Sequence, residues 1–535
     1  MAMLEPVRRP AAIVAHRRWP SPALIAQGLA VTLFFSLAAL RFTIAPLDRY
    51  DEGVTLTKAA LTAAGSIPFR DYWITYGPLD TYALAAAFKA FGINLVIERA
   101  LGVVVLGLLF LVTYAVTGRL GLRGGMRLLL TGLISVVPIS VPAFNSAFLA
   151  NLVGVSAVLA FLCGIDDDRA RWPLLAGALV GLASFSRPEF ALALGIGLGA
   201  GYLVMGLTIM SVRDRLMPYV LGAVSVAAGL WGGTVLMAGI RPVWFDLVTY
   251  ATSLYPRARG IPFGQGDEAP IVIVLGVVFS LIWVWATIRA YRQRAVAGER
   301  ARLAALLVGG MLIFTWVRTR ADGIHAMDAW PLTAILLALL LERRGRQVRP
   351  ATGALPALVP IAGILLLSLG AGGLAYRDLA RPHAAAGIPH SGISGQRAWM
   401  PTPELAGVIR EIDAVTPPDR PIWVGLQRND LVTFNDTMLY FLSGRKPGTV
   451  YYETLPGLTN SEPVERAIAC QLARAGVELA VLGPNGAGEP WNLSSVNGSP
   501  YLDQWLAART TARSQLGPYL LLRLTPGLRP SDRCP

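Results

Sequence analysis

Long apolar segments constrain the fold of this chain more than any other feature. The chain has 535 residues, of which 54% are hydrophobic and 15% charged. A run of about 18 or more apolar residues is long enough to cross a bilayer as a helix. Such runs lie near residues 22–41, 100–117, 127–142, 146–165, 173–186, 190–209, 217–238, 270–288, 303–317, 328–341 and 354–374. The sequence therefore predicts a polytopic α-helical membrane protein with about eleven transmembrane helices.

Positive charge predicts the orientation of these helices. The formal net charge is +14, which in a soluble protein would indicate nucleic acid or another anionic partner. Here the basic residues lie mainly in alternate short loops, for example 119–127 and 289–302, as expected for cytoplasmic loops. We therefore expect a cytoplasmic N-terminus, an uncleaved first span, contact with membrane lipids and no nucleic-acid partner.

This orientation places two large segments on the outer face. The membrane domain spans 1–375 and carries a long first outer loop at about 42–98, in which 79–92 is a short interfacial helix. Residues 376–535 form a soluble extracytoplasmic domain. Its expected strands are 421–425, 448–452, 477–483 and 519–524, and its expected helices are 403–415 and 461–475. Alternating strands and helices predict a small α/β domain.

Three cysteines give little evidence of metal binding. Cys163 lies in an apolar run, and no CxxC, HExxH or Cys/His cluster occurs, so a zinc site is not supported. Cys470 and Cys534 both lie in the polar C-terminal part. They would pair if that part faces an oxidising compartment, but two cysteines alone do not decide the question.

An acidic pair follows the first apolar run. Asp51 and Glu52 lie at the start of the first outer loop, where carboxylates beside a membrane are candidates for function. The same loop contains Arg70, Asp71 and Tyr76, together with several other aromatic residues. An aromatic belt at the interface explains residues such as Trp73, but it explains the acidic pair poorly.

Three further polar turns are predicted on the same outer face. Arg187 and Glu189 separate two apolar runs, and a simple ion pair within that turn is an open alternative. The loop 241–268 contains Arg257 and Arg259, whose guanidinium groups suit phosphate oxygens, although solvation alone also accounts for them.

The last of these turns lies at the end of a span. Arg318, Arg320, Asp322 and His325 fall within eight positions, in a chain that has only four histidines. Such a group suits a bound phosphate or diphosphate and the charge of a leaving group. A histidine at a helix start is, however, more often only part of a cap.

The motifs of the first outer loop resemble those of the GT-C glycosyltransferase superfamily. The order is a span, Asp-Glu, Gly-x-Ile-Pro-Phe-Arg-Asp-Tyr-Trp, Tyr-Gly-Pro-Leu, Phe-Gly, Arg and a second span. The branch of protein O-mannosyltransferases and lipid A aminoarabinose transferase is the most similar. The Arg-x-Asp-x-x-His turn and the segment 440–447 are similar to bacterial members. The resemblance covers 1–375 in layout but only the first loop in motif.

The resemblance implies a bacterial plasma-membrane transferase that uses a polyprenyl-phosphate-linked sugar at its outer face. Asp51 would be the general base on the acceptor hydroxyl, the sugar would transfer with inversion, and Glu52 would assist. The acceptor is a lipid, a protein or a glycan. The expected donor- and phosphate-binding residues are Arg70, Arg257, Arg318, Arg320 and His325. The expected substrate-positioning residues are Asp71, Tyr76, Arg187, Glu189 and Asp322.

The chain departs from metal-dependent relatives in its second outer loop. That loop runs from Pro138 to Asn145 and has no acidic residue. A divalent metal would then lack an expected oxygen ligand, so we favour a reaction without metal or other cofactor. Two alternatives come from other classes: a transporter or flippase of lipid-linked sugars, and a non-catalytic envelope assembly protein. A transporter would place its charges near the bilayer midplane, and an assembly protein would tolerate loss of Asp51.

Overall fold

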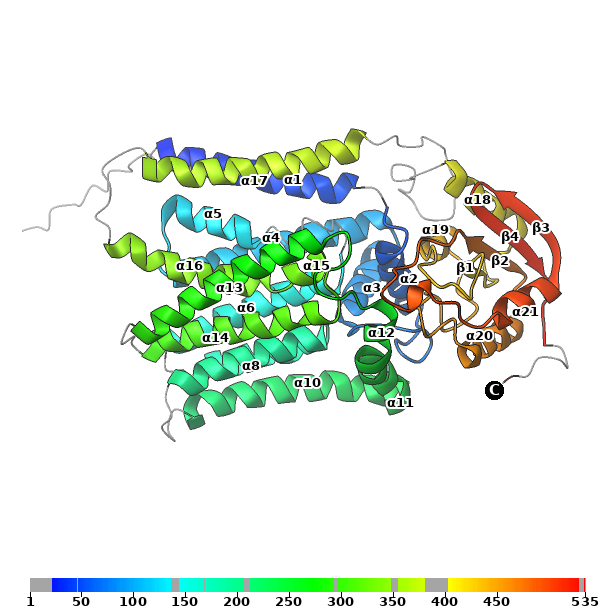
Figure 1. The fold of residues 1–535 in the computed structure, drawn as a ribbon, viewed down its shortest axis with the longest axis horizontal. Coiled ribbons are helices and arrows are strands. Elements are labelled where there is room, and N and C mark those ends of the chain that lie inside the picture. Colours follow the sequence, from blue (N-terminus) through cyan, green and yellow to red (C-terminus); the bar gives the residue numbers. More distant parts are fainter. Residues whose placement is uncertain are drawn as a thin grey trace, which may run out of the picture.

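A bundle of long helices and a small sheet-containing domain beyond one end of it make up the molecule (Figure 1). The computed structural model describes residues 22–45, 47–135, 144–167, 169–205, 212–292, 297–347, 355–380, 403–528 and 534. Each of the eleven apolar runs contains a helix. These helices are α1 (Pro22–Ile44), α4 (Leu95–Arg119), α5 (Gly124–Ile134), α6 (Ser146–Asp166), α7 (Arg171–Ser184), α8 (Pro188–Met205), α10 (Met217–Ala238), α13 (Ala269–Arg292), α14 (Ala297–Phe314), α16 (Trp330–Gln347) and α17 (Leu355–Ala380).

Within the described residues, eight helices are long and apolar enough to cross a membrane. Helices α5 and α7 are shorter, with 11 and 14 residues, and α17 has 26 residues. The predicted polytopic helical membrane protein is confirmed, although three of the eleven predicted spans are not among those eight.

Glycines let neighbouring membrane helices approach closely. A Cβ atom on Gly177 of α7 would lie 1.8 Å from the carbonyl oxygen of Tyr219 in α10, and one on Gly222 would lie 2.2 Å from that of Leu174. Helices α8 and α14 meet in the same way at Gly197, where a Cβ atom would lie 2.7 Å from the Ala305 carbonyl oxygen. Small residues at such contacts are typical of membrane helices, because close packing replaces the hydrophobic effect in lipid.

Short helices cluster where the bundle meets the C-terminal domain. Helices α2 (Asp51–Ala63) and α3 (Leu79–Phe91) belong to the first outer loop. At 13 residues, α3 is too short to cross a bilayer. The remaining short helices of this region are α11 (Ile240–Trp244), the π-helix η3 (Phe245–Leu254), α12 (Tyr255–Arg259), η4 (Thr315–Arg318) and α15 (Gly323–Met327). The π-helix η2 (Val212–Leu216) instead precedes α10, at the opposite end of that helix from α11.

The C-terminal domain has a four-stranded mixed sheet in the order β1-β2-β4-β3. β1 pairs in parallel with β2, and the other two pairs are antiparallel. The predicted α/β domain is therefore present. Its elements are α18 (Pro403–Val415), β1 (Trp423–Leu426), α19 (Met438–Ser443), α20 (Glu462–Arg474), β2 (Leu479–Gly483), η6 (Leu493–Ser495), α21 (Tyr501–Arg509), β3 (Thr510–Leu516) and β4 (Tyr519–Leu524).

One predicted strand, 448–452, is wrong. Its backbone groups bond outside the sheet: the carbonyl of Val450 accepts from the amide of Trp73 at 2.9 Å, and its amide donates to the side chain of Gln471 at 3.0 Å. This segment therefore joins the first outer loop to α20 instead of pairing with a strand.

The C-terminal domain docks on the first outer loop through a shared core. Buried apolar residues run without a break from Phe34 of α1 and Leu56 of α2 to Leu439 of α19 and Val424 of β1. Backbone hydrogen bonds reinforce the contact, including Met438 N to Arg49 O at 3.1 Å. Loop and domain therefore form one packed unit (Figure 1).

A disulfide closes the end of the C-terminal domain. Cys470 of α20 is bonded to Cys534, with the two Cα atoms 5.5 Å apart. The pairing that the sequence left open is thus present, whereas Cys163 is a buried free thiol in α6.

Candidate active site

Asp51 lies in the first turn of α2 with an open carboxylate. The Asp48 carboxylate accepts hydrogen bonds from the amides of Tyr50 and Asp51, both at 2.9 Å, and so begins the helix. The side chain of Asp51 is exposed and makes no hydrogen bond or ion pair with the described residues. An open carboxylate at a helix start is free to meet an incoming group.

Protein surrounds this carboxylate even though solvent reaches it. Burial by the surrounding atoms, together with the charge of Asp48, raises the pKa of Asp51 to about 6. The positive charges of Arg259, His325 and Arg320 oppose this rise. The carboxylate therefore shares one polar region with cations from two other outer turns, and its pKa suits a base near neutral pH.

Glu52 points the other way, into the protein core. It is 1% exposed, and one of its carboxylate oxygens lies 2.6 Å from Nη2 of Arg99 in α4. Its other oxygen accepts the amide of Asp48 at 3.0 Å, and Arg99 also donates to the Phe42 carbonyl at 2.9 Å. Glu52 therefore joins α2 to α1 and α4, and it is buried away from the open side of Asp51.

Asp322 organises the cationic side of this region. Its Oδ2 accepts from Nε of Arg320 at 2.8 Å, while its Oδ1 lies 2.6 Å from Nδ1 of His325 and caps α15. Burial opposes ionisation of Asp322, but the hydrogen bonds and charge of His325 outweigh it and hold its pKa at about 2. The Arg-x-Asp-x-x-His motif is therefore one hydrogen-bonded unit.

Arg320 also connects this turn to the C-terminal domain. Its Nη2 donates to Glu489 Oε1 at 2.7 Å, and its Nη1 donates to the Arg259 carbonyl at 2.6 Å. Arg259 in turn lies over the ring of Phe434, with 3.9 Å from its Cζ atom to the ring centroid. Phe434 packs on Tyr50 at a centroid separation of 4.1 Å. The guanidinium of Arg259 is thus held above an aromatic pair beside Asp51.

A second carboxylate, Glu453, comes from the C-terminal domain. It is 3% exposed and accepts a hydrogen bond from Thr75 Oγ1 at 3.2 Å. Burial raises its pKa to about 7, while the charge of Lys58 lowers it and the charge of Asp51 raises it. Glu453 therefore joins the C-terminal domain to the first outer loop through Thr75, within reach of the charges of Lys58 and Asp51.

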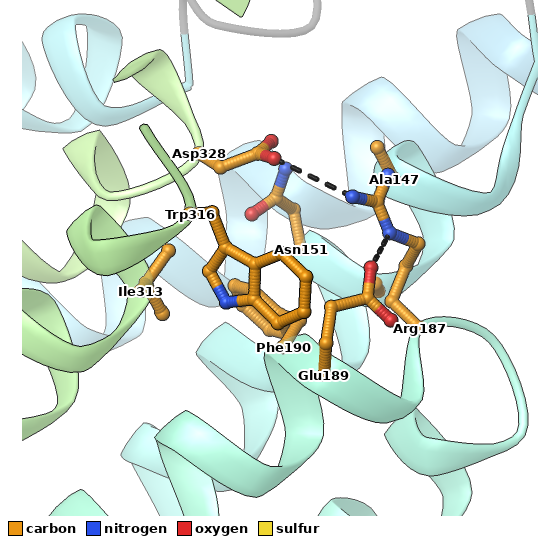
Figure 2. A pocket seen from close by; sticks show the side chains of 9 residues that line it. Ala147, Asn151, Arg187, Glu189, Phe190, Ile313, Trp316 and Asp328 are labelled. Atoms are coloured by element: carbon orange, nitrogen blue, oxygen red, sulfur yellow. Dashed lines mark hydrogen bonds and ion pairs between the residues drawn. The ribbon is translucent and has the colours of Figure 1, made fainter. Parts of the chain in front are cut away.

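Arg187 occupies a partly buried ionic cluster next to this region. It pairs with Glu189 and lies 3.5 Å from Asp328 (Figure 2). Its guanidinium also stacks 4.4 Å from the ring centroid of Tyr76. The adjoining cavity is only about 10 Å³, about enough for one water molecule. The charges of Arg187, Arg259 and Arg320 all act on Tyr255. The four predicted polar turns therefore meet at one end of the bundle.

Two arginines are open to a ligand. Arg257 and Arg318 are exposed, and neither side chain has an ion pair or hydrogen bond within the described part of the chain. Arg318 lines an open hollow of about 500 Å³. Its other lining residues are Pro256, Gly260, Ile261, Pro262, Thr315, Thr319 and Trp491. Its volume falls in the range of small-molecule sites.

Arg70 and Asp71 neutralise each other at the surface. Two hydrogen bonds of 2.8 and 2.9 Å join the guanidinium to the carboxylate, and Asp71 also accepts the amide of Ile67 at 2.8 Å. Both residues are exposed. No contact among the described residues links this pair to the region around Asp51.

The positive groups around Asp51 are side chains of arginine and histidine. Among the described residues, no group of three or more His, Cys, Asp or Glu side chains is arranged to hold a metal ion. Most of the second outer loop, 136–143, lies outside those residues.

The overall arrangement matches a solved structure. The crystal structure of ArnT from Cupriavidus metallidurans bound to undecaprenyl phosphate aligns with 93% of this chain and 97% of that one, at a TM-score of 0.57. The chain has the ArnT fold. The GT-C-type fold predicted from the first outer loop is therefore confirmed. Sequence identity is 13%, no family model matches the chain, and no curated protein matches it in sequence.

Sequence reasoning missed the contribution of the C-terminal domain to this region. Phe434, Glu453 and Glu489 reach it only because the domain docks on the first outer loop. The Thr-Tyr-Gly-Pro-Leu segment contains one indication, since Thr75 is a polar residue among aromatic ones and bonds to Glu453. No pattern in the sequence indicates that Glu453 is the residue to which Thr75 bonds.

Proposed function

We propose that this protein is an integral-membrane glycosyltransferase that moves a sugar from a polyprenyl-phosphate donor to an acceptor hydroxyl. One observation carries the proposal: the open carboxylate of Asp51, with a pKa of about 6, faces a cluster of cations on the ArnT fold. In this arrangement Asp51 would act as the base, and the cations would stabilise the negative charge that develops on the leaving phosphate.

In the proposed step, Asp51 takes the proton of the acceptor hydroxyl. The acceptor oxygen then forms a bond to the anomeric carbon of the sugar, and the bond from that carbon to the phosphate oxygen breaks. The polyprenyl phosphate leaves with the electron pair, and the configuration at the anomeric carbon inverts. Asp51 is the catalytic residue, whereas Glu52 keeps the start of α2 in place through Arg99.

The leaving phosphate needs positive charge that the protein has not already neutralised. ArnT was crystallised with undecaprenyl phosphate, which supports a lipid of this class here. Arg257 and Arg318 are free to bind the phosphate oxygens, and the hollow beside Arg318 offers room. Arg259, Arg320 and His325 add a positive field at Asp51.

The same proposal extends to location and cofactors. The positive-inside pattern favours an outer-face site in a bacterial plasma membrane, and a disulfide in the C-terminal domain suits an oxidising compartment. Guanidinium groups bind phosphate oxygens without a metal, which supports our proposal of a reaction without cofactor. The acceptor class stays open between lipid, protein and glycan.

A deletion strain provides the test. Mass spectrometry of its envelope lipids and glycans should show a missing sugar, which the wild-type gene restores. Asp51→Asn should express and fold normally but restore less than about one hundredth of the product, because a general base contributes about 10²–10⁴-fold. Asp419→Asn, an exposed aspartate of the C-terminal domain, is the matched control and should restore the sugar fully.

Full restoration by Asp51→Asn would refute the base and favour a non-catalytic role. A flippase would instead leave lipid-linked sugar on the inner leaflet of the deletion strain.

A further inference from the structure

A short segment of the C-terminal domain, residues 434–438, contacts the chain next to the proposed base. This segment, which we call the clamp, bonds to the backbone of Arg49 and Tyr50 directly before Asp51. We propose that the clamp holds the Asp51 carboxylate where it can take the acceptor proton, and that Thr437 is its positioning residue. This inference rests on the proposed function and gives the C-terminal domain a direct part in the reaction.

Three donors converge on the two carbonyl groups before Asp51. The amide of Met438 donates to the Arg49 carbonyl at 3.1 Å, and the amide of Val54 donates to the Tyr50 carbonyl at 2.7 Å. The hydroxyl of Thr437 lies 3.1 Å from the Tyr50 oxygen and 3.3 Å from the Arg49 oxygen, so its single proton goes to one or the other. Each carbonyl therefore has a partner without Thr437, and the hydroxyl serves to fix the position of both.

The clamp also packs against Tyr50 and α2. The ring of Phe434 lies on that of Tyr50 with 4.1 Å between the centroids. At Gly53, a Cβ atom would lie only 2.5 Å from the backbone nitrogen of Met438, so the absence of a side chain there permits the contact. Asp51 is thus enclosed between clamp contacts on the residue before it and on the second residue after it.

The C-terminal domain holds the clamp firmly in turn. Asn435 is 1% exposed, and its Nδ2 donates to the carbonyls of Val424 at 2.9 Å and Tyr452 at 2.8 Å. Its Oδ1 accepts the amide of Thr454 at 3.0 Å. A reacting group stays in its productive position only when the residues behind it are themselves locked. Through Asn435, the position of β1 therefore determines that of the first turn of α2.

A base depends strongly on its position, because a misplacement of about 1 Å costs about 100-fold in rate. Thr437→Val keeps the shape of the side chain and removes the hydroxyl. It should lower the transfer rate about 10- to 100-fold. Thr437→Ser keeps the hydroxyl and should stay within about threefold of the wild-type rate.

The test separates turnover from binding. Rates are measured in deletion-strain membranes that carry each protein, with the endogenous polyprenyl-phosphate sugar and acceptor as probe, as product by mass spectrometry per amount of protein. Binding is measured on purified protein in detergent with undecaprenyl phosphate. Thr437→Val should change that Kd by less than about twofold. The reason is that Thr437 is fully buried and does not line the hollow beside Arg318.

Gly53→Ala displaces the clamp without removing a polar group. Alanine favours a helix more than glycine does, so α2 itself is not weakened, but the new Cβ pushes Met438 away. The rate should fall at least as far as in Thr437→Val, and this variant decides the question if Thr437→Val does not fold. The matched controls are Gly407→Ala in α18, where no atom lies within 4 Å of the new Cβ, and Thr511→Val on the exposed edge strand β3. Both should keep the wild-type rate.

The outcomes separate this inference from the function itself. If Asp51→Asn is inactive while Thr437→Val or Gly53→Ala transfers at the wild-type rate, the inference is wrong and the function stands. If rate and undecaprenyl phosphate binding fall together, or Thr437→Ser is as slow as Thr437→Val, the clamp is only structural and the inference is also overturned. If wild-type membranes show no transfer above those of the deletion strain, both fail.

Discussion

At the scale of single residues, the acidic pair shows how a helix divides two neighbouring side chains. Successive residues of a helix point about 100° apart, so Asp51 faces the polar region while Glu52 enters the core beside Arg99. The two side chains therefore have different surroundings, one open and one buried. Glu52 holds the start of α2 through the Asp48 amide and Arg99, which leaves the Asp51 carboxylate open.

The balance of charge around Asp51 predicts a pH dependence. Because its pKa is raised to about 6, activity should be low below pH 5 and rise as the carboxylate loses its proton. Arg259 lowers that pKa, so Arg259→Gln should move the acidic limb to higher pH by up to about one unit. The measurement is the initial transfer rate between pH 4.5 and 8. Arg466→Gln on α20 is a distant control, and a limb that stays in place would contradict this role of Arg259.

Residue chemistry was only partly predictable from the sequence. Asp51 is recognisable because a carboxylate directly after an apolar span is rare and costly. The cluster of Arg320, Asp322 and His325 is also recognisable, since its spacing is local. Glu453 and Phe434 were not, because their relation to Asp51 depends on how two distant segments pack.

At the scale of elements, glycine explains how the first outer loop reaches the Arg187 turn. The amide of Gly77 donates to the Ser186 carbonyl at 3.0 Å, and a Cβ atom on Gly77 would lie 2.3 Å from the Phe185 carbonyl oxygen. The close approach places Tyr76 under the guanidinium of Arg187. The Tyr-Gly-Pro-Leu motif is therefore a docking element of the loop.

Gly77→Ala should accordingly separate the two turns. We expect a loss of about 1–3 kcal/mol in stability, since neither backbone can yield without breaking hydrogen bonds. Thermal unfolding of the purified protein in detergent measures this loss as a lower Tm. Gly229→Ala in α10 has no atom within 4 Å of the new Cβ and should leave Tm unchanged or slightly raised. Equal Tm values for the two variants would disprove the docking role.

Hydrophobic periodicity predicted the regular helices and strands, but it did not predict segments whose pairing depends on tertiary contacts. Helix α18 has the predicted bounds of 403–415, because its apolar residues recur at helical spacing. Strand β3 escaped prediction because its sequence, Thr510–Leu516, is polar and largely exposed at the sheet edge. The segment 448–452 has strand-forming residues, but tertiary contacts take its backbone groups.

At the scale of the whole molecule, the disulfide predicts how the C-terminal domain is stabilised. The bond closes 64 residues between Cys470 and Cys534, which corresponds to about 4 kcal/mol in the chain-entropy estimate. Cys470→Ser should therefore lower the Tm and make it insensitive to reducing agent. Wild-type protein, alkylated after denaturation without reductant, should show one modified cysteine, Cys163. Three modified cysteines would show that the bond does not form in the cell.

The shared core of loop and domain has a consequence for the order of synthesis. Asp51 leaves the ribosome early, whereas Phe434 and Glu453 emerge only after every described helix of the bundle has been made. The region around Asp51 therefore stays incomplete while the helices of the bundle are being made. If Asp51 is the base that we propose, we expect activity to begin only when the C-terminal domain has folded against the first outer loop.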